Sequence, residues 1–473
     1  MNRSIPRVTL RPACRLALLA LAAVAVAPAE SKPAPPNILH IHADDHRPDG
    51  LHALGNDALK TPNLDTLVES GTTFTHCYTM GSMVGAVCLP SRTMMLTGRS
   101  LFNIGNRGTP VTNRMPLPTV LKAVGYEAWH MGKSGNEYMA GIQAFDINIV
   151  DDAKGTGELA SRAFSSRRHA DRAVEFLKSR DKSKPFYIYL APPVPHDPSV
   201  AEPQFHKLYD ATKLPLSPAF LPQHPWDNGD MTVRDEKLAP WPRTPEDTRR
   251  QLAEYYACVT GLDYHVGRIF EALKQSGQFK NTIIVFTGDN GLSLGEHGLF
   301  GKQNLYEFGG MHVPFVLAGP GIPKGRSEAL VYLMDLFPTF CDFAGVTPPL
   351  GTEGKSLRPI IEGKSTKVRN VLYTAYQQGQ RAIRDDRWKL IRYPLVDQTQ
   401  LFDLAADPRE LNNLAAQPEH ATKLRELTAL LQKEMQRYDD PTPLTVANPK
   451  PAAWSPPAQA APPAKKDKAK NRQ

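Results

Sequence analysis

The chain has 473 residues, of which 41% are hydrophobic and 8% aromatic, so its length allows two or three domains with large cores. Its formal net charge is +8, but the excess lies at the two ends of the chain. The first 29 residues hold four arginines and no acid, and the last nine hold five basic residues and one acid. The body is therefore close to neutral, which gives no electrostatic reason to propose nucleic-acid binding.

The first 29 residues have the pattern of a secretory signal peptide. The arginines precede the apolar run LALLALAAVAVA, and the small residues APA at 27–29 are typical of a cleavage site. The run is too short to span a bilayer, and no later segment is long and apolar enough. We predict that residues 1–29 are removed and that the protein is exported, periplasmic or secreted, without a membrane span.

Apolar runs alternate with amphipathic stretches over some 300 residues. The runs include NILHIHA, TTFTHCY, YEAWHMGK, KPFYIYLAPP and NTIIVFTGDNG, and the longest amphipathic stretches are 161–179 and 247–277. This alternation predicts an α/β domain over 37–360 with a large, mostly parallel or mixed sheet flanked by helices. The proline-rich stretch 192–243 shows little periodicity, and we interpret it as a loop that could wall a substrate cleft.

The pattern changes after about residue 371. The segment RAIRDDRWKLIRYP predicts two strands joined by a turn, TQLFDL predicts another strand, and 417–438 predicts an amphipathic helix. These elements indicate a small α+β subdomain with an antiparallel sheet over 365–440. Residues 441–473 are rich in Pro, Ala and Lys, which predicts a disordered tail.

Several polar residues directly follow predicted strands, where functional side chains gather in parallel sheets. These residues are Asp44, Asp45, Lys133, His196, Asp289 and Asn290. Carboxylates and an amide oxygen suit Ca²⁺ or Mg²⁺ better than Zn²⁺. Both acidic segments also resemble ordinary turns, but their place after apolar strands favours a metal site. Converging cations there would bind a tetrahedral oxyanion.

Four cysteines follow the predicted signal peptide: Cys77, Cys88, Cys258 and Cys341. They are too few for a disulfide framework, and at most one bridge could join two of Cys77, Cys258 and Cys341. Cys88 stands apart because it begins the segment CLPSRTMMLTG, at the start of a predicted helix.

From about Asn37 to Leu414 the sequence resembles the type I sulfatases of the alkaline phosphatase superfamily. CLPSRTMMLTG matches the family signature C-x-P-S-R-x-x-x-x-T-G at every fixed position, and DDHRPD, GDNG, GEHGLFGK and RWKLIRY follow the family's order. The resemblance implies an alkaline phosphatase-like fold. It also implies that Cys88 is converted to formylglycine by a formylglycine-generating enzyme, which reads Pro90 and Arg92.

The resemblance further implies a role for each matched residue. Arg92 would orient the formylglycine hydrate, one hydroxyl of which attacks sulfur while the other later releases sulfate. Lys133 and Lys302 would contact sulfate oxygens, and His196 would be a general-acid candidate at the leaving group, with Lys302 as a possible partner. Substrates would be sulfate esters, with sulfated carbohydrates fitting an exported hydrolase. The metal, Ca²⁺ rather than Mg²⁺, would be held by Asp44, Asp45, Cys88, Asp289 and Asn290.

One departure from the family pattern concerns the first lysine. The family usually has Gly-Lys-Trp-His, whereas this chain has GKSGNE, with Ser134 and Gly135 in place of the tryptophan and histidine. Asn136, His130 or another histidine could substitute, although we expect His130 to pack within its strand. Otherwise the pocket could serve an unusual substrate, or activity could be weak.

Two other functions stay open at this point. The first is a phosphoester or phosphonate-ester hydrolase of the same superfamily, and the second is a non-catalytic binder of sulfated glycans. Three arginines, Arg47, Arg381 and Arg384, could contact an acidic sugar, but each is more often a structural ion-pair partner.

Overall fold

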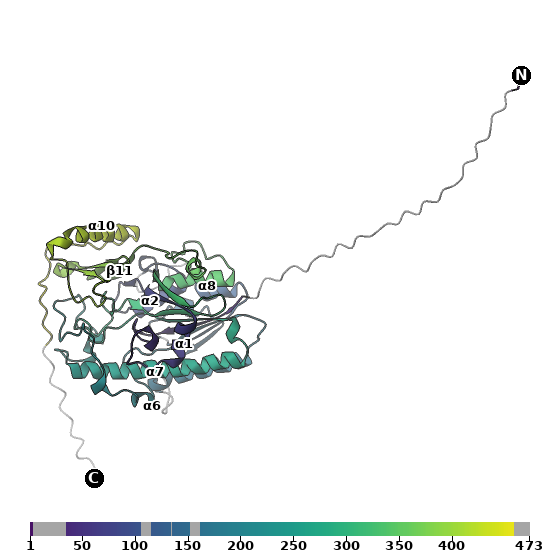
Figure 1. Ribbon diagram of the computed structural model, residues 1–473, viewed down its shortest axis with the longest axis horizontal. Helices are drawn as coiled ribbons and strands as arrows, with labels where there is room; N and C mark the ends of the chain where they lie inside the picture. Colours follow the sequence, from purple (N-terminus) through teal and green to yellow (C-terminus); the bar gives the residue numbers. More distant parts are fainter. Residues whose placement is uncertain (3–34, 106–114, 134, 152–160, 458–473) are drawn as a thin grey trace, which may run out of the picture. The chain divides into compact units, whose positions relative to one another are not determined.

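The predicted apolar strands form the centre of a large sheet in the computed structural model (Figure 1), which describes residues 1–2, 35–105, 115–133, 135–151 and 161–457. The predicted signal peptide beyond its second residue lies outside these ranges, as do Ser134 and residues 458–473. Within the described ranges, no helix has the length and hydropathy needed to cross a membrane.

The chain folds into two sheets and their flanking helices (Figure 1). The strands are β1 (Asn37–Ala43), β2 (Thr72–Tyr78), β3 (Gly81–Ser82), β4 (Glu127–Gly132), β5 (Ile147–Val150), β6 (Phe186–Ala191), β7 (Thr282–Gly288), β8 (His312–Val313), β9 (Phe315–Ala318), β10 (Gly325–Tyr332), β11 (Leu372–Tyr376), β12 (Gln380–Arg384), β13 (Trp388–Tyr393) and β14 (Gln398–Asp403). The helices are α1 (Pro62–Ser70), α2 (Cys88–Thr97), α3 (Leu117–Lys122), α4 (Met139–Ile142), α5 (Ser165–Ser179), α6 (Pro203–His206), α7 (Pro245–Gln275), α8 (Leu336–Ala344), α9 (Arg358–Ile361) and α10 (Ala421–Arg437).

The first sheet has nine strands in the order β10-β2-β9-β7-β1-β6-β4-β5, with β8 beside β2. Its central strands β7, β1, β6 and β4 are parallel neighbours, whereas β9 runs antiparallel to β7 and β2. The predicted large mixed, mostly parallel sheet with flanking helices is confirmed.

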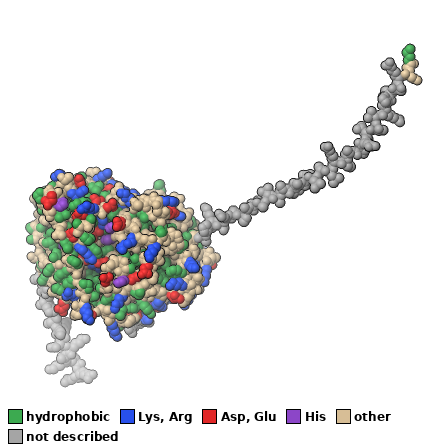
Figure 2. Space-filling model, viewed as in Figure 1, with side chains coloured by type: hydrophobic (Ala, Val, Ile, Leu, Met, Phe, Trp, Pro, Cys, Tyr) green, Lys and Arg blue, Asp and Glu red, His purple; other side chains and the backbone are tan. Residues whose placement is uncertain are grey.

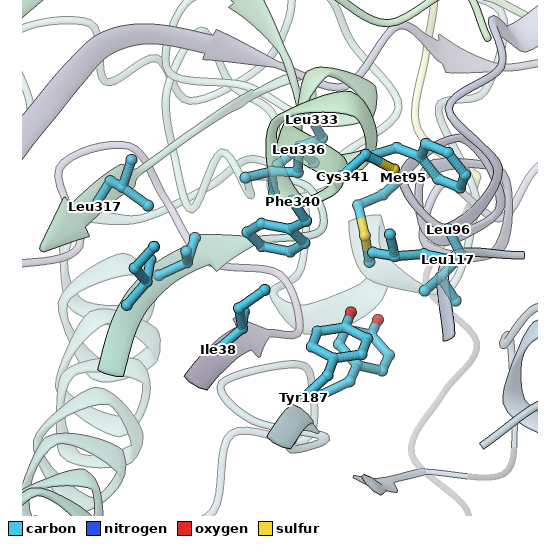
Figure 3. Close-up of a cluster of buried hydrophobic side chains, with 14 of the residues drawn as sticks. Ile38, Met95, Leu96, Leu117, Tyr187, Leu317, Leu333, Leu336, Phe340 and Cys341 are labelled. Carbon is cyan, nitrogen blue, oxygen red and sulfur yellow. The ribbon is translucent and has the colours of Figure 1, made fainter. Parts of the chain in front are cut away.

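Helices cover both faces of this sheet, because alternate residues of its buried strands point to opposite sides. Figure 3 shows one face, where Ile38 and Tyr187 of the sheet pack near Leu336 and Phe340 of α8 and Met95 of α2. The neighbouring strand residues pack instead with α1, α5 and α7. Burial on both faces explains the nearly continuous apolar runs in the sequence.

The second sheet has the order β14-β13-β12-β11-β3 and is antiparallel except for the β11–β3 pair. This confirms the predicted α+β subdomain with its antiparallel sheet and adds a strand from the first hundred residues. Gly81 in β3 has a φ of 122°, and a Cβ there would lie 1.8 Å from the carbonyl oxygen of Ala375. Glycine is therefore required where the chain leading to Cys88 joins the second sheet.

The segment after α10 differs from the expected disordered tail up to residue 457. The amide of Lys450 donates to Leu395 O (2.8 Å), the carbonyl of Ala452 accepts from the Asp227 amide (2.9 Å), and Trp454 packs on Trp241 with ring centroids 5.6 Å apart. Composition alone did not predict that this segment packs on the rest of the chain, because a single tryptophan, Trp454, supplies a large apolar contact. On the face shown in Figure 2, acidic and basic side chains are interspersed, as expected from a nearly neutral body.

Candidate active site and metal centre

The predicted site residues converge at the carboxyl ends of β7, β1, β6 and β4. Asp44 and Asp45 follow β1, and the amide of Asp44 donates to Val194 O just after β6 (3.0 Å). Asp289 follows β7, and its amide donates to Ala43 O (3.0 Å). Asp45 turns the chain away from the sheet with a φ of 62°, a left-handed conformation that aspartate tolerates better than most residues. The parallel register of neighbouring strands thus brings these carboxylates together.

Cys88 is the first residue of α2 and points into this cluster of acids. Its Sγ lies 3.3 Å from Asp44 Oδ1, 3.6 Å from Asp45 Oδ1 and 3.4 Å from Lys302 Nζ. Burial, reinforced by Asp289, raises the pKa of the Cys88 thiol well above its ordinary value. As a cysteine, residue 88 is therefore a neutral thiol at neutral pH and a weak nucleophile.

Two lysines neutralise the acids that follow β1. Lys302 Nζ lies 2.6 Å and 2.7 Å from the two carboxylate oxygens of Asp45, and Lys133 Nζ contacts Asp44 Oδ2. Burial alone would raise the pKa of Asp44, but Lys133 and other cations outweigh it and hold that pKa well below its ordinary value. Burial and Asp44 together raise the pKa of Asp45 and of Asp289.

Arg92, one turn after Cys88, is fully buried between carboxylates. Its Nε donates to Asp289 Oδ2 at 2.8 Å, one Nη contacts Glu137 Oε1, and the other lies 3.6 Å from Asp44 Oδ1. Glu137 belongs to the GKSGNE segment that departs from the family pattern. The segment thus brings Glu137 to the site through its contact with Arg92, in addition to Lys133, which contacts Asp44.

The donor set fits a divalent cation. Possible ligand atoms of Asp44, Asp45, Cys88 and His196 lie within 4.8 Å of one another. The Nδ2 of Asn290 donates to Asp45 Oδ1 and Gly291 O, both at 2.8 Å, which leaves its buried Oδ1 without a partner among the described residues. An unpaired buried carbonyl oxygen beside carboxylates suits Ca²⁺ or Mg²⁺.

The charge balance supports the same conclusion. Six carboxyl groups in this network face four cationic side chains, and this excess of acids favours a bound cation. The cations are Arg92, Lys133, Lys302 and Arg234, and the carboxylates are Asp44, Asp45, Asp289, Glu137, Asp197 and Asp235.

His196 follows β6 and faces the same pocket. Its Nδ1 donates to Asp197 O at 2.7 Å, and its Nε2 lies 3.8 Å from Asp45 Oδ2. Burial lowers the pKa of His196 to about 4. The predicted residues therefore form one cluster, which we call the pocket: Asp44, Asp45, Cys88, Arg92, Lys133, His196, Asp289, Asn290 and Lys302.

Comparison with known proteins identifies the family. The sulfatase family model matches residues 36–346, well over half of the chain. The chain belongs to the sulfatase family. A second model, described as the C-terminal region of N-sulphoglucosamine sulphohydrolase, matches residues 295–438. The protein is therefore a sulfatase-family hydrolase of the alkaline phosphatase superfamily, and members of this family typically use a metal ion and formylglycine.

Relatives in sequence and in structure are sulfatases and phosphonate monoester hydrolases. The chain is 27% identical to an N-acetylglucosamine-6-O-sulfatase of Bacteroides thetaiotaomicron, over 90% of this chain and 91% of that protein. A protein solved with its substrate D-glucosamine-2-N,6-O-disulfate superposes with a TM-score of 0.72 and 25% identity, covering 87% of this chain and 99% of that one. A phosphonate monoester hydrolase of Agrobacterium radiobacter shares the fold, with a TM-score of 0.71 and 22% identity, over 85% of this chain and 96% of that one.

Sequence reasoning missed some residues around the pocket of this sulfatase. Asp235 accepts from Gln303 Nε2 (3.1 Å) and lies 3.9 Å from Lys302 Nζ, while Arg234 bonds to His196. Arg234 and Asp235 belong to the aperiodic stretch 192–243, which carries no pattern that marks them. Glu137 lies in the segment GKSGNE, which departs from the family pattern, but only the fold shows that its carboxylate contacts Arg92.

The other residues that the sequence suggested for the site make structural contacts instead. His130 packs within its strand, with Nδ1 2.7 Å from Asn148 Oδ1, as expected. The three arginines that could have met an acidic sugar are buried in ion pairs: Arg47 with Asp49, Arg381 with Asp440 and Arg384 with Glu307. The four described cysteines are all free.

Proposed function

We propose that this sulfatase hydrolyses sulfate esters on sulfated carbohydrates through a formylglycine made from Cys88 and a bound divalent cation. The observation that carries the proposal is the position of Cys88 Sγ, within 3.6 Å of Asp44, Asp45 and Lys302, in a segment that keeps every fixed position of the sulfatase signature. Carbohydrate substrates are supported by the relatives named above, one an N-acetylglucosamine-6-O-sulfatase and one bound to a disulfated glucosamine.

The metal would be Ca²⁺ rather than Mg²⁺, held by carboxylate oxygens and one amide oxygen. Asp44, Asp45, Asp289 and the free Oδ1 of Asn290 would supply these ligands, together with residue 88. Bound there, the ion would act as a Lewis acid toward a sulfate oxygen.

The chain's own residues would bind the sulfate and orient the nucleophile. Lys133 and Lys302 would donate to sulfate oxygens; their ammonium groups lie at the site, on Asp44 and Asp45. Arg92, held by Asp289 and Glu137, would orient residue 88 from the next turn of α2. One hydroxyl of the formylglycine hydrate would attack sulfur as the S–O bond to the ester alcohol breaks; loss of the proton from the second hydroxyl would then re-form the aldehyde and release sulfate.

His196 would hold the leaving-group side of the substrate. The hydrogen bond from Nδ1 to the Asp197 carbonyl leaves Nε2, which accepts from Arg234, as the ring atom nearest Asp45. To act as a general acid, Nε2 would first take up a proton and then give it to the leaving oxygen. Export follows from the signal-peptide pattern of residues 1–29, and conversion of Cys88 would require a formylglycine-generating enzyme before or during export.

The test combines mass spectrometry with turnover. Protein co-produced with a formylglycine-generating enzyme should contain the aldehyde or its hydrate at residue 88 and should hydrolyse an aryl sulfate. Cys88→Ala should lose this activity by at least about a thousandfold while keeping the far-ultraviolet circular dichroism of the parent. An unmodified thiol, under conditions that convert a control sulfatase, would contradict the proposal.

A phosphonate or phosphate monoester hydrolase is the second candidate, favoured by the shared fold of two solved phosphonate monoester hydrolases with TM-scores of 0.71 and 0.70. An aryl phosphate and an aryl phosphonate ester assayed beside the aryl sulfate separate the two. Confirmed formylglycine with ligand binding but no turnover of any ester would instead identify a sulfated-glycan binder.

A further inference from the structure

Arg234 lies at the edge of the pocket and bonds to the side chain proposed to face the leaving group. Its Nη2 is 3.1 Å from His196 Nε2, 2.8 Å from Asp197 Oδ1 and 2.8 Å from Asp235 Oδ1. The arginine side chain is 61% exposed, whereas the two aspartates that hold it are almost fully buried. An accessible guanidinium is thus anchored by buried carboxylates directly beside His196.

The anchoring uses only one edge of the guanidinium. Nε donates to Asp235 at 3.1 Å and Nη2 makes the three contacts above, while Nη1 has no hydrogen bond to any residue that the structure describes. A guanidinium that is already oriented loses less rotational freedom when it binds a further group than a free surface arginine does. Nη1 is therefore a donor that is already oriented and that remains available to bind a substrate group.

The position of Nη2 determines which part of a substrate Arg234 meets. A substrate oxygen that approaches His196 Nε2 comes within reach of the guanidinium, because Arg234 Nη2 lies 3.1 Å from that nitrogen. If His196 faces the leaving oxygen, Arg234 faces the ring that carries the sulfate ester. The N–H groups of Nη1 can form charge-assisted hydrogen bonds with carboxylate or sulfate-type oxygens, which are stronger than bonds to a neutral hydroxyl.

We propose that Arg234 is a specificity-determining residue that selects substrates with a second anionic group, a carboxylate or another sulfate, next to the scissile sulfate ester. This inference rests on the proposed function, because it assumes that the sulfate binds between residue 88 and His196. An uncharged sugar ring would leave Nη1 bonded only to water and would gain no selectivity from Arg234.

Binding of non-hydrolysable sulfonates tests the proposal without turnover. Benzenesulfonate provides one anion, while 3-sulfobenzoate and benzene-1,3-disulfonate add a carboxylate or a second sulfonate. Dissociation constants are measured by isothermal titration calorimetry on the full-length, calcium-loaded protein and its variants. The wild type should bind the better dianion about tenfold more tightly than benzenesulfonate, and comparison of the two dianions shows which group is preferred.

Arg234→Gln should reduce this preference, the ratio of the dissociation constants for benzenesulfonate and the better dianion, to less than about twofold. Arg234→Lys should keep part of the preference, because the charge remains but the planar group that orients Nη1 through its bonds to Asp197 and Asp235 is lost. The matched control is Arg387→Gln, since Arg387 is also 61% exposed and also paired with an aspartate, Asp403. This control should keep the wild-type ratio.

Each other outcome has a defined meaning. A wild-type protein with no preference for dianions, or an Arg234→Gln variant with the wild-type ratio, overturns the inference. An Arg234→Gln variant that weakens all three ligands equally shows that the arginine acts only by positioning His196, which also overturns it. A wild-type protein that binds none of the three sulfonates contradicts the sulfate pocket itself, and so the proposed function.

Discussion

The contact between Glu137 and Arg92 gives a sharp prediction, because both side chains are fully buried beside the proposed nucleophile. Glu137→Gln keeps the shape of the side chain and one acceptor oxygen but removes the charge. Breaking a buried ion pair completely costs about 3–5 kcal/mol. Asp289 stays bonded to Arg92 at 2.8 Å, so the expected loss is that of one charge-assisted hydrogen bond, about 1.5–3 kcal/mol.

The same substitution should reduce activity, because the contact that orients Arg92 on the side of residue 137 would be weakened by the loss of charge. We expect kcat/KM for an aryl sulfate to fall about tenfold to a hundredfold. Stability is measured by urea unfolding with circular dichroism. The control is Glu175→Gln, whose partner Arg172 is exposed, with an expected change below about 0.5 kcal/mol. Equal effects of the two substitutions on stability and activity would refute the reasoning.

Three further predictions concern the metal, a titrating helix contact and the link between the sheets. Chelation with EDTA should lower the unfolding temperature, because the carboxylates of the site repel one another, and excess Ca²⁺ should restore it. Asn290→Leu should weaken this response to EDTA and Ca²⁺. An unfolding temperature unaffected by EDTA would count against the metal site. Asp263, which accepts from the Leu64 amide at 2.7 Å, has its pKa raised by burial to about 6. The unfolded carboxyl ionises at lower pH, so stability should fall by up to about 3 kcal/mol as pH rises from about 4 to 6, and Asp263→Asn should abolish this contribution in urea titrations across that range. Lys389 Nζ lies 2.9 Å from both Glu307 and Glu410, so Lys389→Met should cost about 3–5 kcal/mol in urea unfolding, whereas Lys423→Met at an exposed pair should cost almost nothing.

Local patterns in the sequence were enough for the strands and for much of the pocket. Apolar runs such as NILHIHA and TIIVFTG predict strands clearly, because strands buried on both faces of a parallel sheet are apolar along their whole length. The residues that follow these strands must meet at the carboxyl edge of the sheet. Asp44, Asp45, Asp289 and Asn290 could therefore be placed together before any coordinates were known. The signature around Cys88 added the nucleophile and Arg92.

Contacts between segments that share no periodicity could be decided only by the tertiary structure. Glu137 meets Arg92, Arg234 reaches His196 from an irregular loop, β3 joins the second sheet, and the segment up to residue 457 packs on that loop through Trp454. Period-two and period-3.6 patterns report which face of an element is buried, but they carry no information on which distant loop will cover it. The sequence alone thus determined the family chemistry and the floor of the pocket, whereas its rim, and with it the basis for substrate selection, depends on long-range packing.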